Sequence, residues 1–187
     1  MVIRVNSPRI ATLLALSLSI SACWSSSAPL FEASQSVTPL PSGEYLYHSG
    51  AGESQSDRVA LWKIPGGGYV YYNKAEDNAL PLLTYEFDDG WYLLQIGPTE
   101  ETLLLIARTT PTRIEVFDPD CDEEIGAISG VGRTESRYSG YNCSFNTLEA
   151  AVAAAQFVQA RIESGVPIEP HGWFEPTPIE RFGDANP

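Results

Sequence analysis

Short apolar runs, evenly spaced and separated by turn-forming residues, constrain the fold of this chain more than any other feature. We read three pairs of runs as successive β-hairpins, because residues that favour tight turns join each pair. The predicted strands are 57–64 with 68–74, 80–87 with 91–96, and 102–108 with 112–117. The turns are Pro65-Gly66-Gly67, Asp88-Asp89-Gly90 and Thr109-Thr110-Pro111. The pattern predicts a mainly β fold, an antiparallel meander or a small barrel-like sheet.

One helix is predicted to follow the strands and to pack on them, over residues 146–164. Asn146 is expected to cap its start, with Glu149 completing a capping box, and Gly165 is expected to end it. An apolar stripe runs along its body at spacings of three and four: Leu148, Val152, Ala155, Val158 and Ile162. The many alanines would let this helix lie close against the sheet or across a barrel mouth.

The rest of the chain divides by composition. Residues 24–42 are rich in serine and proline and nearly uncharged, which is typical of a flexible tether. The domain is predicted over 43–165, with an irregular stretch at 118–146. Residues 166–187 contain five prolines and are predicted to form an extended tail, in which Trp173 and Phe174 pack back on the domain.

The amino terminus has the features of an exported protein. Arg4 and Arg9 precede an apolar run over 10–20 that is too short to span a bilayer, and the small residues Ser21 and Ala22 follow. The segment Ile20-Ser21-Ala22-Cys23 resembles the lipobox of bacterial lipoproteins. That resemblance covers residues 1–23, and no family is recognised for the mature domain.

The resemblance implies cleavage of a signal peptide over 1–22 and lipidation of Cys23, with palmitate-type acyl chains holding the protein to a membrane. Two or more chains give stable anchoring, which one chain does not. Trp24, in place of the aspartate that retains many lipoproteins in the inner membrane, favours the outer membrane of a Gram-negative bacterium. The domain would then lie in the periplasm, and residues 23–42 would be a lipidated tether.

Charge and cysteine content narrow the functional classes. The chain has 24 acidic and 11 basic side chains, so nucleic acid is excluded as a partner because its binding depends on lysine and arginine.

Cys121 and Cys143 are the two cysteines of the predicted mature chain. In an exported protein such a pair predicts a disulfide, worth about 3 kcal/mol of stability for a loop of this length. Their spacing suits neither a zinc site nor a redox pair.

An aromatic set on the predicted strands offers the best indication of a ligand. Rings on one face could stack on sugars or bind an apolar chain, although ordinary strand packing explains them as well. The candidate ligand face consists of Trp62, Tyr69, Tyr71, Tyr85 and Trp91.

Other motifs predict less. The acidic segment 118–124 has oxygen ligands suited to calcium but departs from the EF-hand pattern at Glu123 and Ser129, so calcium binding stays open. Neither His48 nor His171 lies in a recognisable catalytic motif, and we predict no catalytic residue, metal ligand or cofactor.

The sequence therefore predicts an envelope lipoprotein that acts as a non-enzymatic binding or assembly module. Its partners would be the membrane through the lipid and an envelope protein, a glycan or a small apolar ligand. The alternative is a small envelope hydrolase that uses His48 or paired carboxylates. A cavity lined by the aromatic set would favour a small ligand, and an outward aromatic patch would favour a protein or glycan.

Overall fold

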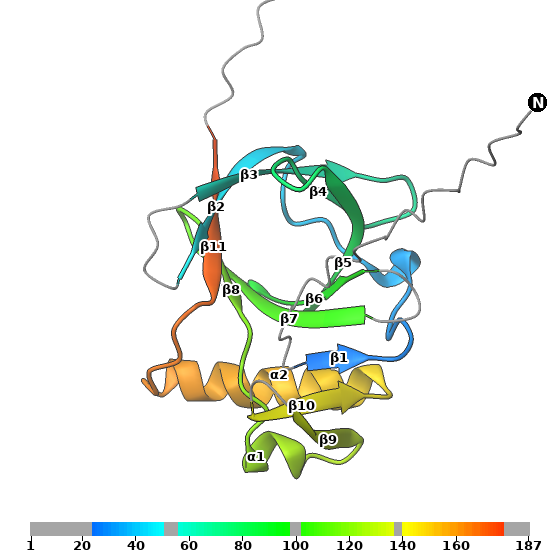
Figure 1. Ribbon diagram of the computed structural model, residues 1–187, viewed down its shortest axis with the longest axis vertical. Helices are drawn as coiled ribbons and strands as arrows, with labels where there is room; N and C mark the ends of the chain where they lie inside the picture. Colours follow the sequence, from blue (N-terminus) through cyan, green and yellow to red (C-terminus); the bar gives the residue numbers. More distant parts are fainter. Residues whose placement is uncertain (1–23, 51–55, 98–101, 137–139, 178–187) are drawn as a thin grey trace, which may run out of the picture.

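The computed structural model describes residues 24–50, 56–97, 102–136 and 140–177. A barrel forms one half of the molecule, and a helix with a short sheet lies against the outside of the barrel (Figure 1). The barrel strands are β2 (Gly43–Ser49), β3 (Ser56–Lys63), β4 (Tyr69–Asn73), β5 (Asn78–Asp88), β6 (Trp91–Ile96), β7 (Thr102–Thr109), β8 (Ile114–Phe117) and β11 (Gly172–Pro176). The remaining elements are β1 (Trp24–Ser26), a 3-10 helix η1 (Ala33–Gln35), α1 (Glu123–Gly126), β9 (Val131–Ser136), β10 (Gly140–Phe145) and α2 (Leu148–Glu163).

The sheet closes on itself. Strands β2 to β8 pair in sequence order, each antiparallel to the next, and β11 pairs antiparallel with both β8 and β2. Among the described residues this ring contains eight strands. Closure removes the unpaired edges that an open sheet would expose. The prediction of a mainly β meander or barrel with one packing helix is therefore confirmed.

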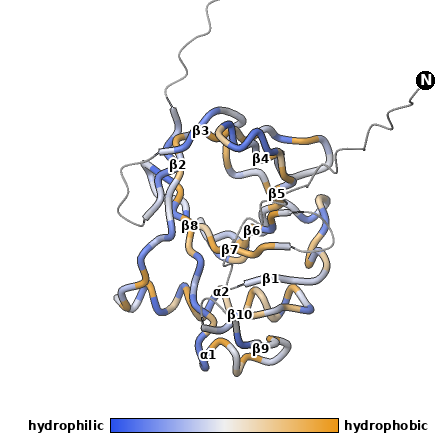
Figure 2. Tube along the Cα trace, viewed as in Figure 1, coloured by the Kyte–Doolittle hydropathy of each residue, from blue (hydrophilic) through white to orange (hydrophobic). Residues whose placement is uncertain are grey.

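The three predicted hairpins are also confirmed. They are β3–β4, β5–β6 and β7–β8, with strand ends within a few residues of the predicted ones. The β3–β4 turn needs glycine, because Gly66 and Gly67 both adopt positive φ and a Cβ at Gly67 would collide with the carbonyl oxygen of Ala33. Figure 2 shows hydrophobic and hydrophilic residues interspersed along the part of the chain that forms the barrel.

The prediction of a tail outside the domain is wrong for residues 172–176, although Trp173 and Phe174 do pack on the domain as predicted. This segment is β11, and its register pairs Gly172 with Ser49 of β2 on one side and with Val116 of β8 on the other. Gly172 is required there, because a Cβ would lie 2.5 Å from the hydroxyl of Tyr47. Prolines and charged residues hid this strand, since its sequence has no run of apolar residues.

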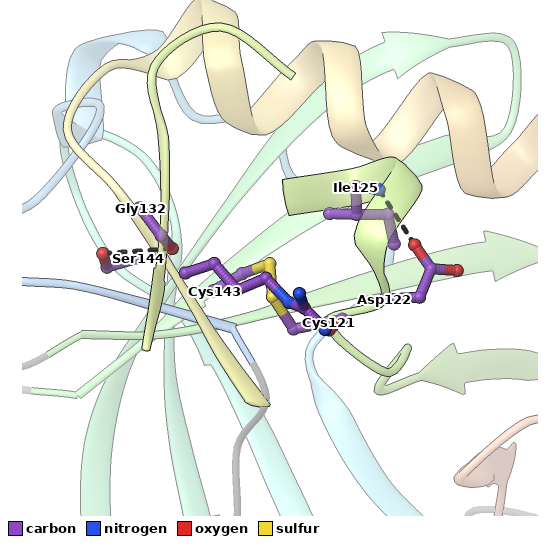
Figure 3. Close-up of a disulfide and its surroundings, with 7 residues drawn as sticks. Cys121, Asp122, Ile125, Gly132, Cys143 and Ser144 are labelled. Carbon is purple, nitrogen blue, oxygen red and sulfur yellow. Dashed lines mark hydrogen bonds between the residues drawn. A yellow bond between two sulfur atoms is a disulfide. The ribbon is translucent and has the colours of Figure 1, made fainter. Parts of the chain in front are cut away.

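The prediction of an irregular stretch over 118–146 is wrong as well. It contains α1 and an antiparallel hairpin, β9–β10. The predicted disulfide is present, with an S–S distance of 2.04 Å between Cys121 and Cys143 (Figure 3). It joins the segment before α1 to β10, and Asp122 beside it caps α1 by accepting a hydrogen bond from the Ile125 amide at 2.9 Å.

Helix α2 begins one residue later than predicted. Thr147, rather than Asn146, caps it by accepting a hydrogen bond from the Ala150 amide at 3.2 Å. The buried face is made of small residues followed by Val158, namely Ala150, Ala151, Ala154 and Ala155. The helix therefore packs in the buried cluster outside the barrel wall and does not cross the mouth of the barrel.

The prediction of a tether is wrong for residues 24–42. Strand β1 pairs with β7 and, in parallel, with β10, and the side chain of Trp24 is completely buried. Phe31 is buried too. The side chain of Gln95 on β6 accepts a hydrogen bond from the Leu30 amide at 2.7 Å and donates one to the Phe31 carbonyl at 3.2 Å. Apolar residues scattered among serines thus anchor a segment whose overall composition is typical of disorder.

The barrel wall separates two clusters of buried residues. Outward-facing side chains of β6, β7 and β8 pack against β1, β10, α1 and α2, with the disulfide among them. Inward-facing side chains of the same strands line the barrel interior. Strands β6 and β7 are consequently buried on both faces, which explains their near-continuous apolar runs.

Because β11 closes the ring, a chain that ends at Gly165 should lose the fold. Strands β2 and β8 would each be left with an unpaired edge, and we expect no cooperative urea unfolding by circular dichroism. A chain that ends at Thr177 keeps β11 and serves as the control. Cooperative unfolding of the shorter chain at the same urea concentration as the control would show that closure is dispensable.

Candidate functional site

The barrel encloses a cavity of about 410 Å³. Strand alternation directs odd-numbered residues of β2, β3, β4 and β7, and even-numbered residues of β5, β6, β8 and β11, toward it. The wall is mainly apolar and includes Leu40, Leu61, Tyr69, Leu80, Leu82, Tyr92, Leu94, Ile96, Leu103, Leu105, Ala107, Ile114, Val116 and Phe174. Barrels of this strand number are just wide enough to be filled by side chains or to hold one small ligand. Here space remains.

One end of the barrel, the covered end, is crossed by the chain before β2. Tyr69 reaches this segment from β4, accepting a hydrogen bond from the Leu40 amide at 2.8 Å and donating to the Leu40 carbonyl at 3.0 Å. The Val37 amide donates to the Thr84 carbonyl at 2.9 Å, and the Thr84 hydroxyl donates to the Val37 carbonyl. Pro39 and Leu40 therefore form part of the cavity wall.

The other end, which we call the polar mouth, gathers hydroxyl, amide, imidazole and carboxyl groups. The register brings them together, since Tyr47 pairs with Asp57 and Asn73 with Asn78 at the corresponding strand ends. The residues of the polar mouth are Tyr47, Asp57, Tyr71, Asn73, Glu76, Asn78, Asp118 and His171. The cavity thus has an apolar body and one polar end.

The charges at the polar mouth act on its tyrosines. Burial, together with the negative charges of Asp57 and Asp118, raises the pKa of Tyr47 above its ordinary value of 10.0. Burial raises the pKa of Tyr71 to about 12, with smaller contributions from Tyr47, Glu76 and Asp57. At the covered end, burial raises the pKa of Tyr69 to about 12 as well. Both causes disfavour a phenolate, so these rings remain neutral far above pH 7.

The predicted ligand face is divided by the barrel wall. Tyr69 and Tyr71 point into the cavity. Tyr85 packs outside against Phe31 with ring centroids 5.5 Å apart, and Trp91 packs outside against Phe117 at 5.9 Å. Trp62 also faces outward, where it is 49% exposed and stacks on Tyr72.

Most of the cavity could not be found in the sequence. No local motif marks Tyr47 or Asp57, and the sequence suggested calcium binding rather than a cavity for Asp118. The signal that exists is alternation, which shows that Tyr69 and Tyr71 share a face. Which face points inward is set by closure, and that depends on β11.

The two histidines lie on different sides of the wall. His48 faces outward, stacks on Trp173 with ring centroids 5.1 Å apart, and places Nε2 3.4 Å from Oε2 of Glu175. His171 lies at the polar mouth. The structure therefore does not bring the two histidines together, and it gives His48 a packing role beside β11.

The acidic segment 118–124 does not act as one unit. Asp118 lines the cavity, whereas Asp122 caps α1 and accepts a hydrogen bond from Nη1 of Arg161 at 2.6 Å. Within the described residues, no group of three or more histidine, cysteine, aspartate or glutamate side chains is arranged to hold a metal ion.

A buried ion cluster stabilises the wall on its outer side. Glu115 accepts hydrogen bonds from Nε of Arg108 at 3.0 Å and from Nε of Arg113 at 3.1 Å. Burial alone would raise the pKa of Glu115, but the two guanidinium groups outweigh it and hold this pKa below its ordinary value. Arg113 also lies over the ring of Trp173, so the cluster links β8 to β11.

No protein-family model matches this chain, and neither characterised proteins nor solved structures gave a match. Among the described residues, no helix has both the length and the apolar character needed to cross a membrane.

The raised tyrosine pKa values predict a loss of stability in alkali. The folded protein keeps the protons of Tyr69 and Tyr71 up to about pH 12, whereas the unfolded chain releases them near 10.0. The stabilisation is complete below pH 10 and is lost as the pH rises toward 12, because the unfolded state then binds fewer protons. The free energy of unfolding, measured in urea at successive pH values, should fall less steeply in Tyr71→Phe. Parallel curves for the variant and the wild type would contradict this.

Proposed function

We propose that this protein is a lipid-anchored envelope protein whose barrel binds a small, mainly apolar molecule. The observation that carries the proposal is the cavity of about 410 Å³, enclosed by apolar side chains from the whole ring of strands. Its volume lies within the range of small-molecule sites, which are mostly apolar with a few placed polar groups.

The energetics of such a site are favourable. Burial of each CH₂ group supplies about 0.8 kcal/mol, so a chain of about six such groups would supply about 5 kcal/mol. Part of this gain offsets the translational and rotational freedom lost on association, and polar contacts at the mouth would add to the remainder. A closed barrel also holds its wall in place before binding, which lowers the entropic cost of association.

The lipid anchor is supported by the lipobox-like segment before Trp24. Because Trp24 is buried in β1, a lipid on Cys23 would be joined to the folded domain without a spacer. The domain would then sit directly at the membrane surface, where apolar molecules concentrate. The chain's net charge of −13 gives it no attraction to anionic headgroups, so the acyl chains would carry the attachment.

Binding of an envelope protein or glycan is the second candidate. It is favoured by the outward stack of Trp62 on Tyr72, whose ring centroids lie 5.7 Å apart. This patch is much smaller than the cavity wall, and we therefore rank it second. Loss of a captured envelope partner in Trp62→Ala, with ligand binding intact, would support it.

The hydrolase alternative gains one feature, because Asp57, Glu76 and Asp118 gather at the polar mouth. The rest of the cavity wall is mainly apolar. Such a lining suits a bound apolar molecule, and we therefore rank binding above hydrolysis.

Filling the cavity should abolish binding. N-phenyl-1-naphthylamine, a neutral apolar dye, should fluoresce more strongly in the presence of the wild-type protein, because it enters the cavity. Ala107→Phe places a ring in the cavity and should weaken binding at least about tenfold, equivalent to about 1.4 kcal/mol. Ala79→Phe adds the same ring on the exposed outer face of β5 and should bind as the wild type does. Equal binding by both variants would place the dye elsewhere.

Replacing the lipidated residue should release the protein from membranes. In bacteria labelled with radioactive palmitate, the wild-type chain should carry label and sediment with membranes, whereas Cys23→Ser should do neither. The variant Cys121→Ser/Cys143→Ser lacks the disulfide cysteines and should keep the label. A wild-type chain without label would refute the anchor.

A further inference from the structure

We propose that the ligand carries a positively charged head group, which is held at the polar mouth while its apolar part fills the barrel. This inference rests on the proposed binding function and specifies the chemical class of the ligand. The occupant would be an amphipathic amine or quaternary ammonium compound rather than a fatty acid or another anionic lipid.

The first argument is the sign of the charge. Three carboxyl groups, those of Asp57, Glu76 and Asp118, line the cavity, and the lining that the structure describes contains no lysine or arginine. The basic residues nearest in sequence, Arg58 and Lys74, line a separate groove on the outer face. An anionic head group would be repelled by these carboxylates, with no lysine or arginine in the described lining to compensate.

The second argument is the aromatic surface next to these acids. Tyr47 and Phe174 lie in the wall with ring centroids 5.0 Å apart, and Tyr71 lines the cavity beside them. Ring faces attract cations, and they favour quaternary ammonium groups most clearly. Raised pKa values keep Tyr47 and Tyr71 uncharged, so both can act as neutral ring faces at physiological pH.

The third argument is the separation of polar and apolar lining. The acids occupy one end only, and the covered end presents Leu40, Pro39 and Tyr69. A ligand with one charged end and an apolar body would therefore bind in one orientation. A head group at the mouth stays close to water, which lowers the desolvation cost of a charge.

The test compares three decyl compounds that differ only in head-group charge: decyltrimethylammonium, 1-decanol and decyl sulfate. Each is used below its critical micelle concentration to displace N-phenyl-1-naphthylamine from the full mature domain. All three compounds are measured at one pH and one ionic strength, so that the charge of the head group is the only variable. We expect the ammonium compound to bind at least about tenfold more tightly than the alcohol, and the sulfate to bind most weakly.

Charge-neutralising variants locate the effect. Asp57→Asn/Glu76→Gln/Asp118→Asn should bring the affinity for the ammonium compound to within about twofold of that for the alcohol. The control Asp89→Asn/Glu135→Gln/Glu169→Gln removes the same charge from exposed positions outside the cavity and should keep the full preference. If the mouth variant fails to fold by circular dichroism, the wild-type salt dependence decides. Only the ammonium affinity should fall as salt rises, because salt screens charges at an open mouth.

The outcomes separate the two proposals. Equal affinity for the three decyl compounds, or a preference that survives in the mouth variant, would overturn the cationic ligand while leaving the binding function in place. Absence of binding by the dye and by all three compounds would overturn the binding function itself.

Discussion

Closure of the barrel by β11 is the constraint on which the rest of this structure depends. Strand β11 begins 55 residues after the last residue of β8. It lies between β8 and β2 and pairs with both. Without it the meander would be an open sheet whose concave face could not enclose a cavity. The buried Glu115, the half-exposed Arg108 and Arg113 that bind it, and the ring of Trp173 reinforce this seam from outside.

The segment between β8 and β11, residues 118–171, leaves the barrel and covers part of its outer face. It contributes α1, β9, β10 and α2, which cover the outer face of β6 and β7 together with β1. The disulfide joins the start of this segment to β10 and thereby shortens the loop that must be ordered before β11 can pair. The alanine-rich face of α2 belongs to the buried cluster that packs on the outer side of β6 and β7.

The strands of the wall are packed on their outer side as well as on their inner side. Outward-facing side chains of β6 and β7 are buried among β1, β10, α1 and α2, so these strands do not depend on a filled interior for all of their packing. The covered end is sealed by main-chain and tyrosine hydrogen bonds from the segment before β2, and the acids are confined to the other end. The same segment continues back to Trp24, whose side chain is buried where β1 pairs with β7 and β10.

Local patterns alone determined the three hairpins, the disulfide pairing and the existence of α2, because turn residues, cysteine count and helical periodicity act over short stretches of chain. They also placed Tyr69 and Tyr71 on a common face, since side chains alternate along a strand. The order of residues 24–42, the strand at 172–176, the division of the aromatic set and the polar mouth were decided only by the tertiary structure. These features depend on pairing between segments far apart in the chain. The residues that stabilise such pairing are distant in sequence, so a short stretch of sequence does not reveal them.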